Sequence, residues 1–248
     1  MKIDSYAYIG FWPYWPIKTR SVSDLIGLMD KWSIDKAVVS SLRSVFAVDV
    51  DGGNREVYEA MKKWPDRLVG CATLDLSSVD DALRQIAEAE DEGIRGFRLY
   101  PLYNGYSLKK VHQKIVNRLI DASLPIIIPY RLIMNWSLPT LSSSEIESFI
   151  PKVPDLPIIL CGGNYPELAA TMDIMLRFEN VHFETSCLQT WNGIKNLVDM
   201  IGADRVLLGL GLPLQYPACG LTKVEHADIS ETDKRKIMGE NAKRLFKI

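Results

Sequence analysis

The stretch KIDSYAYIG, residues 2–10, predicts a buried β-strand at the centre of the domain. Side chains in a strand alternate between its two faces. Asp4, Tyr6 and Tyr8 therefore share one face, and their polar tips suit the inside of a barrel. The opposite face is small or apolar and suits packing against helices; it carries Ile3, Ser5, Ala7 and Ile9.

Short apolar runs alternate with amphipathic patterns through the rest of the chain. Seven further strands are predicted at 36–41, 67–75, 94–100, 125–130, 157–161, 181–186 and 205–211. One helix begins after Ser21, which has capping-box spacing to Asp24, and seven more are predicted at 54–64, 78–92, 107–122, 144–150, 166–178, 190–201 and 230–246. Such a pattern indicates a parallel sheet covered by helices. Eight units predict an α/β fold of the (β/α)₈ TIM-barrel type, in a single domain that spans residues 1–248. An open doubly wound sheet is the alternative, but it usually has fewer units.

Composition excludes several classes of function. Lysine and arginine total 29 against 31 aspartates and glutamates, so no basic surplus is available to neutralise the phosphates of a nucleic acid. No segment has the pattern of a signal peptide or a membrane span. The four cysteines are widely spaced and form no C-x-x-C pair, which predicts reduced thiols in a cytoplasmic protein.

Several segments share motifs with one known family. The chain resembles the amidohydrolase-related family, a branch of the metal-dependent amidohydrolase superfamily. In members of that family the first strand has the sequence pattern I-D-x-H-x-H-x-G. This chain has the isoleucine, aspartate and glycine of the pattern at Ile3, Asp4 and Gly10. Six more segments resemble family motifs in the family's order: NREVYEAMKKWPDRLVGCATLD (54–75), GIRGFRLYP (93–101), LCGG (160–163), VHFETS (181–186), DRVLLGLGLP (204–213) and GENAKRLF (239–246).

The resemblance also places the family's metal ligands, and this chain has other residues there. The positions of four histidines and one aspartate hold Tyr6, Tyr8, Pro129 or Tyr130, Cys161 and Gly211. A catalytic zinc needs about three N, O or S ligands at about 2 Å. Proline and glycine side chains offer no donor, and tyrosine must first lose a proton with a pKa of about 10. The sequence therefore predicts that this chain binds no metal and no cofactor.

The alternation of side chains along each strand nevertheless predicts that polar side chains line the mouth of the barrel. Arg98 and Glu184 are the candidate catalytic residues, because a guanidinium suits a carboxylate or phosphate and a glutamate in a dry pocket can act as a general base. A small, anionic ligand is expected to contact Tyr6, Tyr8, Tyr100, Tyr130, Cys161 and Asn164. The alternative is that Arg98 pairs with Glu184 and that the tyrosines fill the volume left by the metal.

Two functions fit these observations. The first is a degenerate family member, a pseudoenzyme that binds a small molecule or serves as a partner subunit without metal. The second is a metal-independent hydrolase, lactonase or decarboxylase-like enzyme that acts on a small carboxylate. The aromatic loop Phe11–Pro16, FWPYWP, is expected to pack on the barrel end, to cover a ligand or to form a contact in a homo-oligomer.

Overall fold

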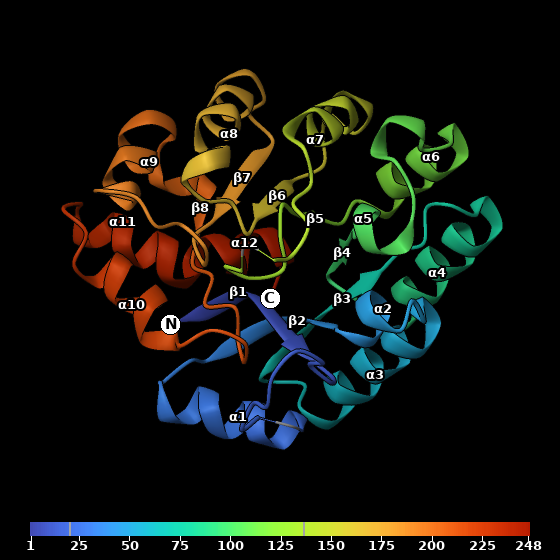
Figure 1. The fold of residues 1–248 in the computed structure, drawn as a ribbon, viewed down its shortest axis with the longest axis horizontal. Coiled ribbons are helices and arrows are strands. Elements are labelled where there is room, and N and C mark those ends of the chain that lie inside the picture. The colour runs from blue at the N-terminus through green and yellow to red at the C-terminus, as the bar shows by residue number, and fades with distance from the viewer. Residues whose placement is uncertain (20, 136) are drawn as a thin grey trace.

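Eight parallel strands form a nearly closed barrel, as predicted. The computed structural model describes residues 1–19, 21–135 and 137–248, and Figure 1 shows the strands surrounded by helices. Each strand pairs with the next one along the chain. The strands are β1 (Ile3–Ile9), β2 (Lys36–Ser41), β3 (Leu68–Thr73), β4 (Gly96–Arg98), β5 (Ile126–Pro129), β6 (Ile158–Cys161), β7 (Val181–Glu184) and β8 (Val206–Leu207). The chain therefore has the (β/α)₈ architecture.

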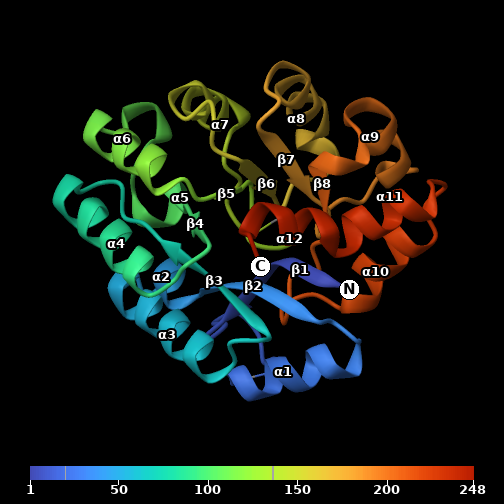
Figure 2. The ribbon, with the colours of Figure 1, turned by 180° about the vertical axis from the view of Figure 1, so that it is seen from behind.

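Helices cover the outside of the barrel, as Figures 1 and 2 show from opposite sides. The longer ones are α1 (Val22–Lys31), α3 (Val50–Lys63), α4 (Val79–Asp91), α6 (Gln113–Ala122), α7 (Ser143–Phe149), α8 (Tyr165–Arg177), α9 (Gly193–Ile201) and α10 (Pro217–Glu225). Short helices α2 (Arg43–Phe46) and α5 (Pro101–Asn104) follow β2 and β4. At the C-terminus α11 (Glu231–Arg235) continues through a π-helical turn into α12 (Asn241–Phe246). None of the helices in the described ranges combines the length and the apolar character that a membrane span requires.

Some helix boundaries differ from those predicted, because caps decide where helices begin. The helix predicted at 54–64 starts earlier, since the Asp49 side chain accepts a hydrogen bond from Gly52 N at 2.8 Å. The helix predicted at 107–122 is interrupted, because His112 Nδ1 accepts a hydrogen bond from Lys114 N at 3.2 Å and caps α6 there. The sequence patterns predicted none of α2, α5 and α10.

Asp4 joins the last strand to the first. Its carboxylate is fully buried and accepts hydrogen bonds from the backbone N–H groups of Leu210 (2.8 Å), Leu212 (3.2 Å) and Tyr6 (3.0 Å). Two backbone hydrogen bonds link the same segments: Ser5 N to Leu208 O (3.0 Å) and Tyr8 N to Leu212 O (2.7 Å). Because β8 is only two residues long, the Asp4 side chain supplies hydrogen bonds between the first and last strands that backbone pairing would otherwise make.

The strict alternation predicted for β1 is wrong at its start. The register of β1 against β2 shifts between Asp4 and Ala7. Ile3 consequently lies in the same interior apolar cluster as Tyr6 and Tyr8, whereas Ala7 lies in the layer between strands and helices. A bulge of this kind adds a residue and resets which face each side chain occupies.

Apolar side chains close the barrel interior at both of its ends. At one end α12 crosses the barrel axis, as Figure 2 shows, and Leu245 and Phe246 belong to the interior cluster. At the other end Leu132 and Ile133, from the β5–α7 connection, belong to the same cluster. A second, larger apolar layer fills the space between the strands and the surrounding helices.

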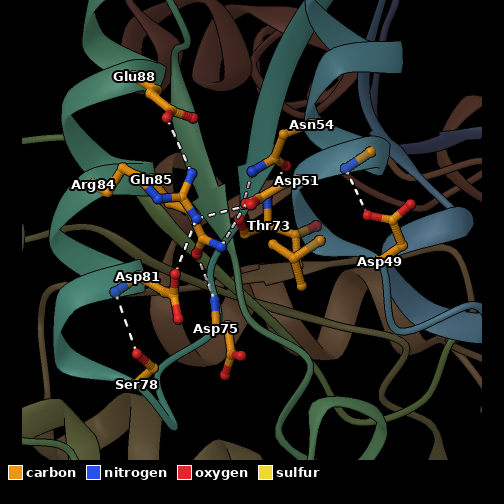
Figure 3. Close-up of polar contacts among 12 residues, drawn as sticks. Asp49, Asp51, Asn54, Thr73, Asp75, Ser78, Asp81, Arg84, Gln85 and Glu88 are labelled. Carbon is orange, nitrogen blue, oxygen red and sulfur yellow. Dashed lines mark hydrogen bonds and ion pairs between the residues drawn. The ribbon is translucent and has the colours of Figure 1, made fainter.

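A polar network on the outside of the barrel fixes the end of β3 (Figure 3). The Asn54 amide donates to Thr73 O (2.9 Å) and accepts from Thr73 N (2.8 Å). Gln85 on α4 accepts from Asp75 N (2.9 Å) and donates to Asp51 on α3 (2.9 Å). These contacts tie α3 and α4 to the C-terminal end of β3, where Thr73 enters the barrel interior.

Candidate functional site

Arg98, the last residue of β4, extends across the barrel interior. Its side chain is fully buried. The guanidinium donates hydrogen bonds to Ser40 Oγ (2.8 Å), Ala7 O (3.0 Å) and Val38 O (3.3 Å). All three acceptors are neutral, and Glu184, the partner predicted in the alternative interpretation, is not among them. Arg98 therefore connects β4 to β1 and β2 without a carboxylate partner in these contacts.

The side chains of Tyr6 and Tyr8 lie between the Arg98 guanidinium and the segment that follows β5. Their ring centroids are 4.9 Å and 5.3 Å from the guanidinium carbon, an arrangement that stabilises a buried cation. Their hydroxyl groups donate hydrogen bonds to the backbone oxygens of Arg131 (3.0 Å) and Leu132 (3.1 Å). Burial raises the pKa of both phenols well above the usual value, so both are neutral donors.

The segment that receives these hydrogen bonds comprises residues 131–135, which we call the plug. Its Leu132 and Ile133 side chains are buried against the interior cluster. Arg131 forms an ion pair with Glu167 on α8. Between the plug and Tyr100 lies a cavity of about 10 Å³, enough for about one water molecule. The candidate site is thus closed from above by the plug.

The structure brings Tyr100 and Cys161 into the same interior as Arg98. The Tyr100 hydroxyl lies 2.9 Å from Ser40 Oγ, which itself accepts from Arg98, so the three side chains form a chain of hydrogen bonds. Cys161 is fully buried, and its thiol donates a long hydrogen bond to Ile159 O (3.9 Å). Six of the eight predicted site residues therefore share this interior: Arg98, Glu184, Tyr6, Tyr8, Tyr100 and Cys161.

Tyr130 contacts α8, and Asn164 contacts both the start of α8 and the plug, where its Nδ2 donates to Met134 Sδ at 3.2 Å. The Tyr130 hydroxyl accepts a hydrogen bond from Thr171 on α8 at 2.9 Å, and its ring lies in the outer apolar layer. Asn164 caps α8, and its side-chain oxygen accepts from Gln189 N at 2.9 Å. Tyr130 follows β5 with its ring toward the helices, although the residue also lines the small cavity beside Tyr100, and its expected contact with a ligand stays a prediction.

Glu184, at the end of β7, is fully buried and satisfied by neighbouring donors. Its carboxylate accepts from Ser186 N, from Ser186 Oγ (2.9 Å) and from Gly162 N (3.3 Å). Gly209 makes this position available, because a methyl group there would overlap Glu184 Oε1. Burial raises the pKa of Glu184 to about 7, against the opposing effect of these hydrogen bonds.

Because of this raised pKa, the free energy of unfolding is expected to decrease as the pH rises. The unfolded chain releases the Glu184 proton near pH 4.5 and the folded chain only near pH 7. The neutral carboxyl therefore contributes stability that is complete below pH 4.5 and is lost as the pH rises through 7, about 3 kcal/mol in total. Glu184→Gln is expected to remove most of this dependence, because its amide stays neutral and its oxygen can still accept a hydrogen bond from Ser186.

Urea unfolding at pH 5 and pH 8 measures the effect, with Glu179→Gln as the exposed control. Other buried groups contribute equally in all variants and in opposite directions, since burial raises the pKa of Asp4 and lowers the pKa of His182 to about 4, so each variant is compared with the wild type by the difference in slope. Equal slopes in the wild type and the Glu184→Gln variant would contradict the prediction.

The donor set at the family's ligand positions does not fit a metal. Tyr6 and Tyr8 are protonated and donate to carbonyl oxygens. Burial raises the pKa of Cys161 well above that of an ordinary thiol. At Gly211 the space for a side chain is taken by Gln215. Within the described residues, no three histidine, cysteine or acidic side chains converge as a metal site would require.

The larger cavities lie outside the barrel. One of about 570 Å³ lies between α9 and α10, and one of about 510 Å³ is formed by the aromatic loop Phe11–Pro16. In that loop Trp12 is buried and packs on Phe46 with ring centroids 5.4 Å apart, whereas Phe11 is 80% exposed. The loop is therefore anchored on the barrel end through Trp12.

Two residues of this interior, Ser40 and Thr73, were not predicted as part of the site, and neither was the contact between Gly209 and Glu184. Ser40 and Thr73 are polar residues inside strand runs, a signal that the sequence does contain. Thr73 Oγ1 is buried and has no hydrogen-bond partner among the described residues. The role of Gly209 has no comparable signal, because it depends on which side chain from β7 lies opposite it.

Fold and site together define a (β/α)₈ barrel with a buried cationic interior at its C-terminal end. Residues 34–248 match the family model described as Amidohydrolase, and the chain belongs to this family. The resemblance inferred from the motifs is confirmed. A search of curated proteins finds no match.

Solved structures share the fold at low sequence identity. The 5-carboxyvanillate decarboxylase from Sphingomonas paucimobilis superposes with a TM-score of 0.79 at 16% identity, covering 100% of this chain and 99% of that one. The 2,6-dihydroxybenzoate decarboxylase from Rhizobium gives 0.76 at 18%, covering 99% and 98%. A dihydroxybenzoic acid decarboxylase from Polaromonas, with bound manganese and 2-nitroresorcinol, gives 0.77 at 19%, covering 99% and 96%. At these identities the likeness concerns the fold alone.

Proposed function

We propose that this chain is a metal-free member of the amidohydrolase family that binds a small carboxylate in its barrel and has lost metal-dependent hydrolysis. The observation that carries the proposal is the environment of Arg98. Its guanidinium is fully buried, and within the described residues the hydrogen-bond acceptors found for it are neutral oxygens; the buried Asp4 carboxyl interacts with it electrostatically but accepts none of these hydrogen bonds. Buried charges in proteins are ordinarily paired. An anionic ligand would supply the charge that these contacts lack.

The replaced ligand positions support the metal-free part of the proposal. Two of them hold phenols that donate hydrogen bonds to carbonyl oxygens, and a third has its side-chain space filled by Gln215. Restoring a metal site would require each of these contacts to be broken. The same groups serve instead as neutral donors and apolar surface for an organic ligand.

Titration calorimetry with a panel of small carboxylates, and with phosphate, tests this function. At least one carboxylate is expected to bind with one-to-one stoichiometry, and Arg98→Met is expected to weaken it by about tenfold or more, as for loss of a charge-assisted hydrogen bond. Arg95→Met, at the exposed position before β4, is the matched control. Binding that is indifferent to Arg98 would contradict the carboxylate part. Near-stoichiometric manganese or zinc after dialysis, measured by elemental analysis, would contradict the metal-free part.

A second candidate is a metal-independent decarboxylase. Two observations favour it: the pKa of about 7 at Glu184, and the fold shared with proteins named as decarboxylases. Loss of carbon dioxide from a bound carboxylate leaves an electron pair on carbon, which the Glu184 proton would neutralise; water would then return a proton to Glu184. Release of carbon dioxide from 2,6-dihydroxybenzoate in the presence of a chelator, abolished by Glu184→Gln, would establish this candidate over the first.

A further inference from the structure

We propose that the plug occupies the place of the ligand, and that a small carboxylate with an apolar body binds by displacing it. The inference rests on the proposed function and describes the route by which the ligand reaches the neighbourhood of Arg98. In this structure the predicted site residues around Arg98 are buried, and the cavity between Tyr100 and the plug has room for about one water molecule. A ligand can therefore enter only where part of the chain moves.

The plug presents two acceptor oxygens to two phenol donors. Arg131 O and Leu132 O belong to consecutive residues, and each accepts one hydrogen bond, from Tyr6 and Tyr8 respectively. A carboxylate also carries two acceptor oxygens, and its charge makes hydrogen bonds from the same donors stronger. It would thus satisfy both phenols and place a negative charge at the hydroxyl ends of the two rings whose faces lie against Arg98.

The apolar part of the plug indicates what the rest of the ligand is like. Leu132 and Ile133 are 0% and 3% exposed and pack in the interior cluster, together with Leu138 farther along the connection. Withdrawing them would open an apolar space next to the phenols. A ligand with a hydrocarbon body would fill this space, whereas a small diacid would bury a second charge there at high cost.

Two further polar atoms in the interior are unused. Thr73 Oγ1 and Arg98 Nε are buried and have no partner among the described residues. The two residues are register partners on β3 and β4. Because buried donors without a partner are uncommon in folded proteins, these atoms mark a place where a ligand oxygen or a water molecule would be held.

The connection is built so that the plug can leave while the barrel stays intact. Leu141 N donates to Tyr130 O at 2.8 Å, which joins the two ends of the connection independently of the plug. Tyr130 N in turn donates to Cys161 O at 2.8 Å, which holds the end of β5 on β6. Movement of the plug breaks the two phenol contacts, the apolar packing, the Arg131–Glu167 ion pair and the hydrogen bond from Asn164 Nδ2 to Met134 Sδ (3.2 Å), but no strand pairing.

Hydrogen exchange of the full-length protein tests the role of the phenols. Tyr6→Phe/Tyr8→Phe keeps both rings against Arg98 and removes both hydroxyls. Loss of two neutral hydrogen bonds, each worth a factor of about five, is expected to speed exchange of the 131–135 peptide by about 30-fold. Tyr130→Phe removes a buried hydroxyl on the outer face and is expected to leave that peptide unchanged. Exchange of the peptide no faster in the double variant than in Tyr130→Phe would overturn the proposal.

Benzoate binding tests displacement directly, with succinate as the diacid control. Leu132→Ala/Ile133→Ala weakens the plug and keeps every donor, so a tenfold increase in its open fraction would tighten benzoate binding by about tenfold. Tyr6→Phe/Tyr8→Phe opens the plug but lacks the donors, so it is expected to bind benzoate more weakly than Leu132→Ala/Ile133→Ala. Benzoate binding that depends on Arg98 but is not tightened in Leu132→Ala/Ile133→Ala would overturn the plug and leave the proposed function standing.

Discussion

Asp4→Ala is expected to lower the free energy of unfolding by about 4 kcal/mol, because it leaves three buried backbone N–H groups without an acceptor. Those groups belong to Tyr6, Leu210 and Leu212, at the junction of the first and last strands. Asp4→Asn is expected to have an intermediate effect, since an amide retains one acceptor oxygen but turns an N–H₂ group toward one of the donors.

Urea unfolding of wild-type and variant proteins at constant pH measures this difference. Asp30→Ala is the matched control, because Asp30 makes an exposed ion pair with Arg67 at 2.7 Å and such pairs contribute about 0–1 kcal/mol. A further expectation is local: hydrogen exchange in Asp4→Ala should accelerate first at Leu210 and Leu212. If Asp4→Ala lowers the free energy of unfolding no more than Asp30→Ala does, the backbone hydrogen bonds between the first and last strands are sufficient to close the barrel.

Most of the fold was predictable because it depends on patterns that are local in sequence. The strand at 36–41 has the predicted bounds, and Ser21 caps α1 with the predicted capping box. Several other strands are shorter in the structure than predicted. Of the strand predicted at 205–211, only Val206–Leu207 is paired as a strand. The reason is that ladder pairing ends where the neighbouring strand turns away, and the neighbour's geometry is not contained in the strand's own residues.

The candidate site was predictable only in part, for the same reason. Parity placed Arg98, Tyr6 and Tyr8 inside the barrel correctly. It assigned Tyr130 to the inner face, whereas Tyr130 lies in the outer apolar layer with Ile126 and Ile128, in alternation with the interior Ile127, so the register assumed for this strand was off by one residue. It also could not show that Tyr6 and Tyr8 bind backbone oxygens more than 120 positions away. Contacts to a loop carry no periodic signal.

Gly209→Ala is expected to lower the free energy of unfolding by about 3 kcal/mol, a large effect for a single methyl group. The added carbon would overlap Glu184 Oε1, so the carboxylate must leave its position. It would then lose the hydrogen bonds from Ser186 and Gly162, each worth about 1 kcal/mol. Gly27→Ala is the matched control, because nothing lies within 4 Å of a methyl group there. That change in α1 is expected to stabilise the protein by about 0.5–1 kcal/mol.

A double-mutant cycle separates this overlap from an effect on the backbone. If the methyl group acts by displacing Glu184, truncating that side chain removes the reason for the loss. Gly209→Ala is then expected to cost little in a Glu184→Ala background, which gives a coupling energy of about 2 kcal/mol. If instead the alanine strains the backbone between β8 and α10, the two losses add. An additive cycle would therefore show that Gly209 is required by the chain path, and a strongly coupled one that it is required by the buried carboxyl group of β7.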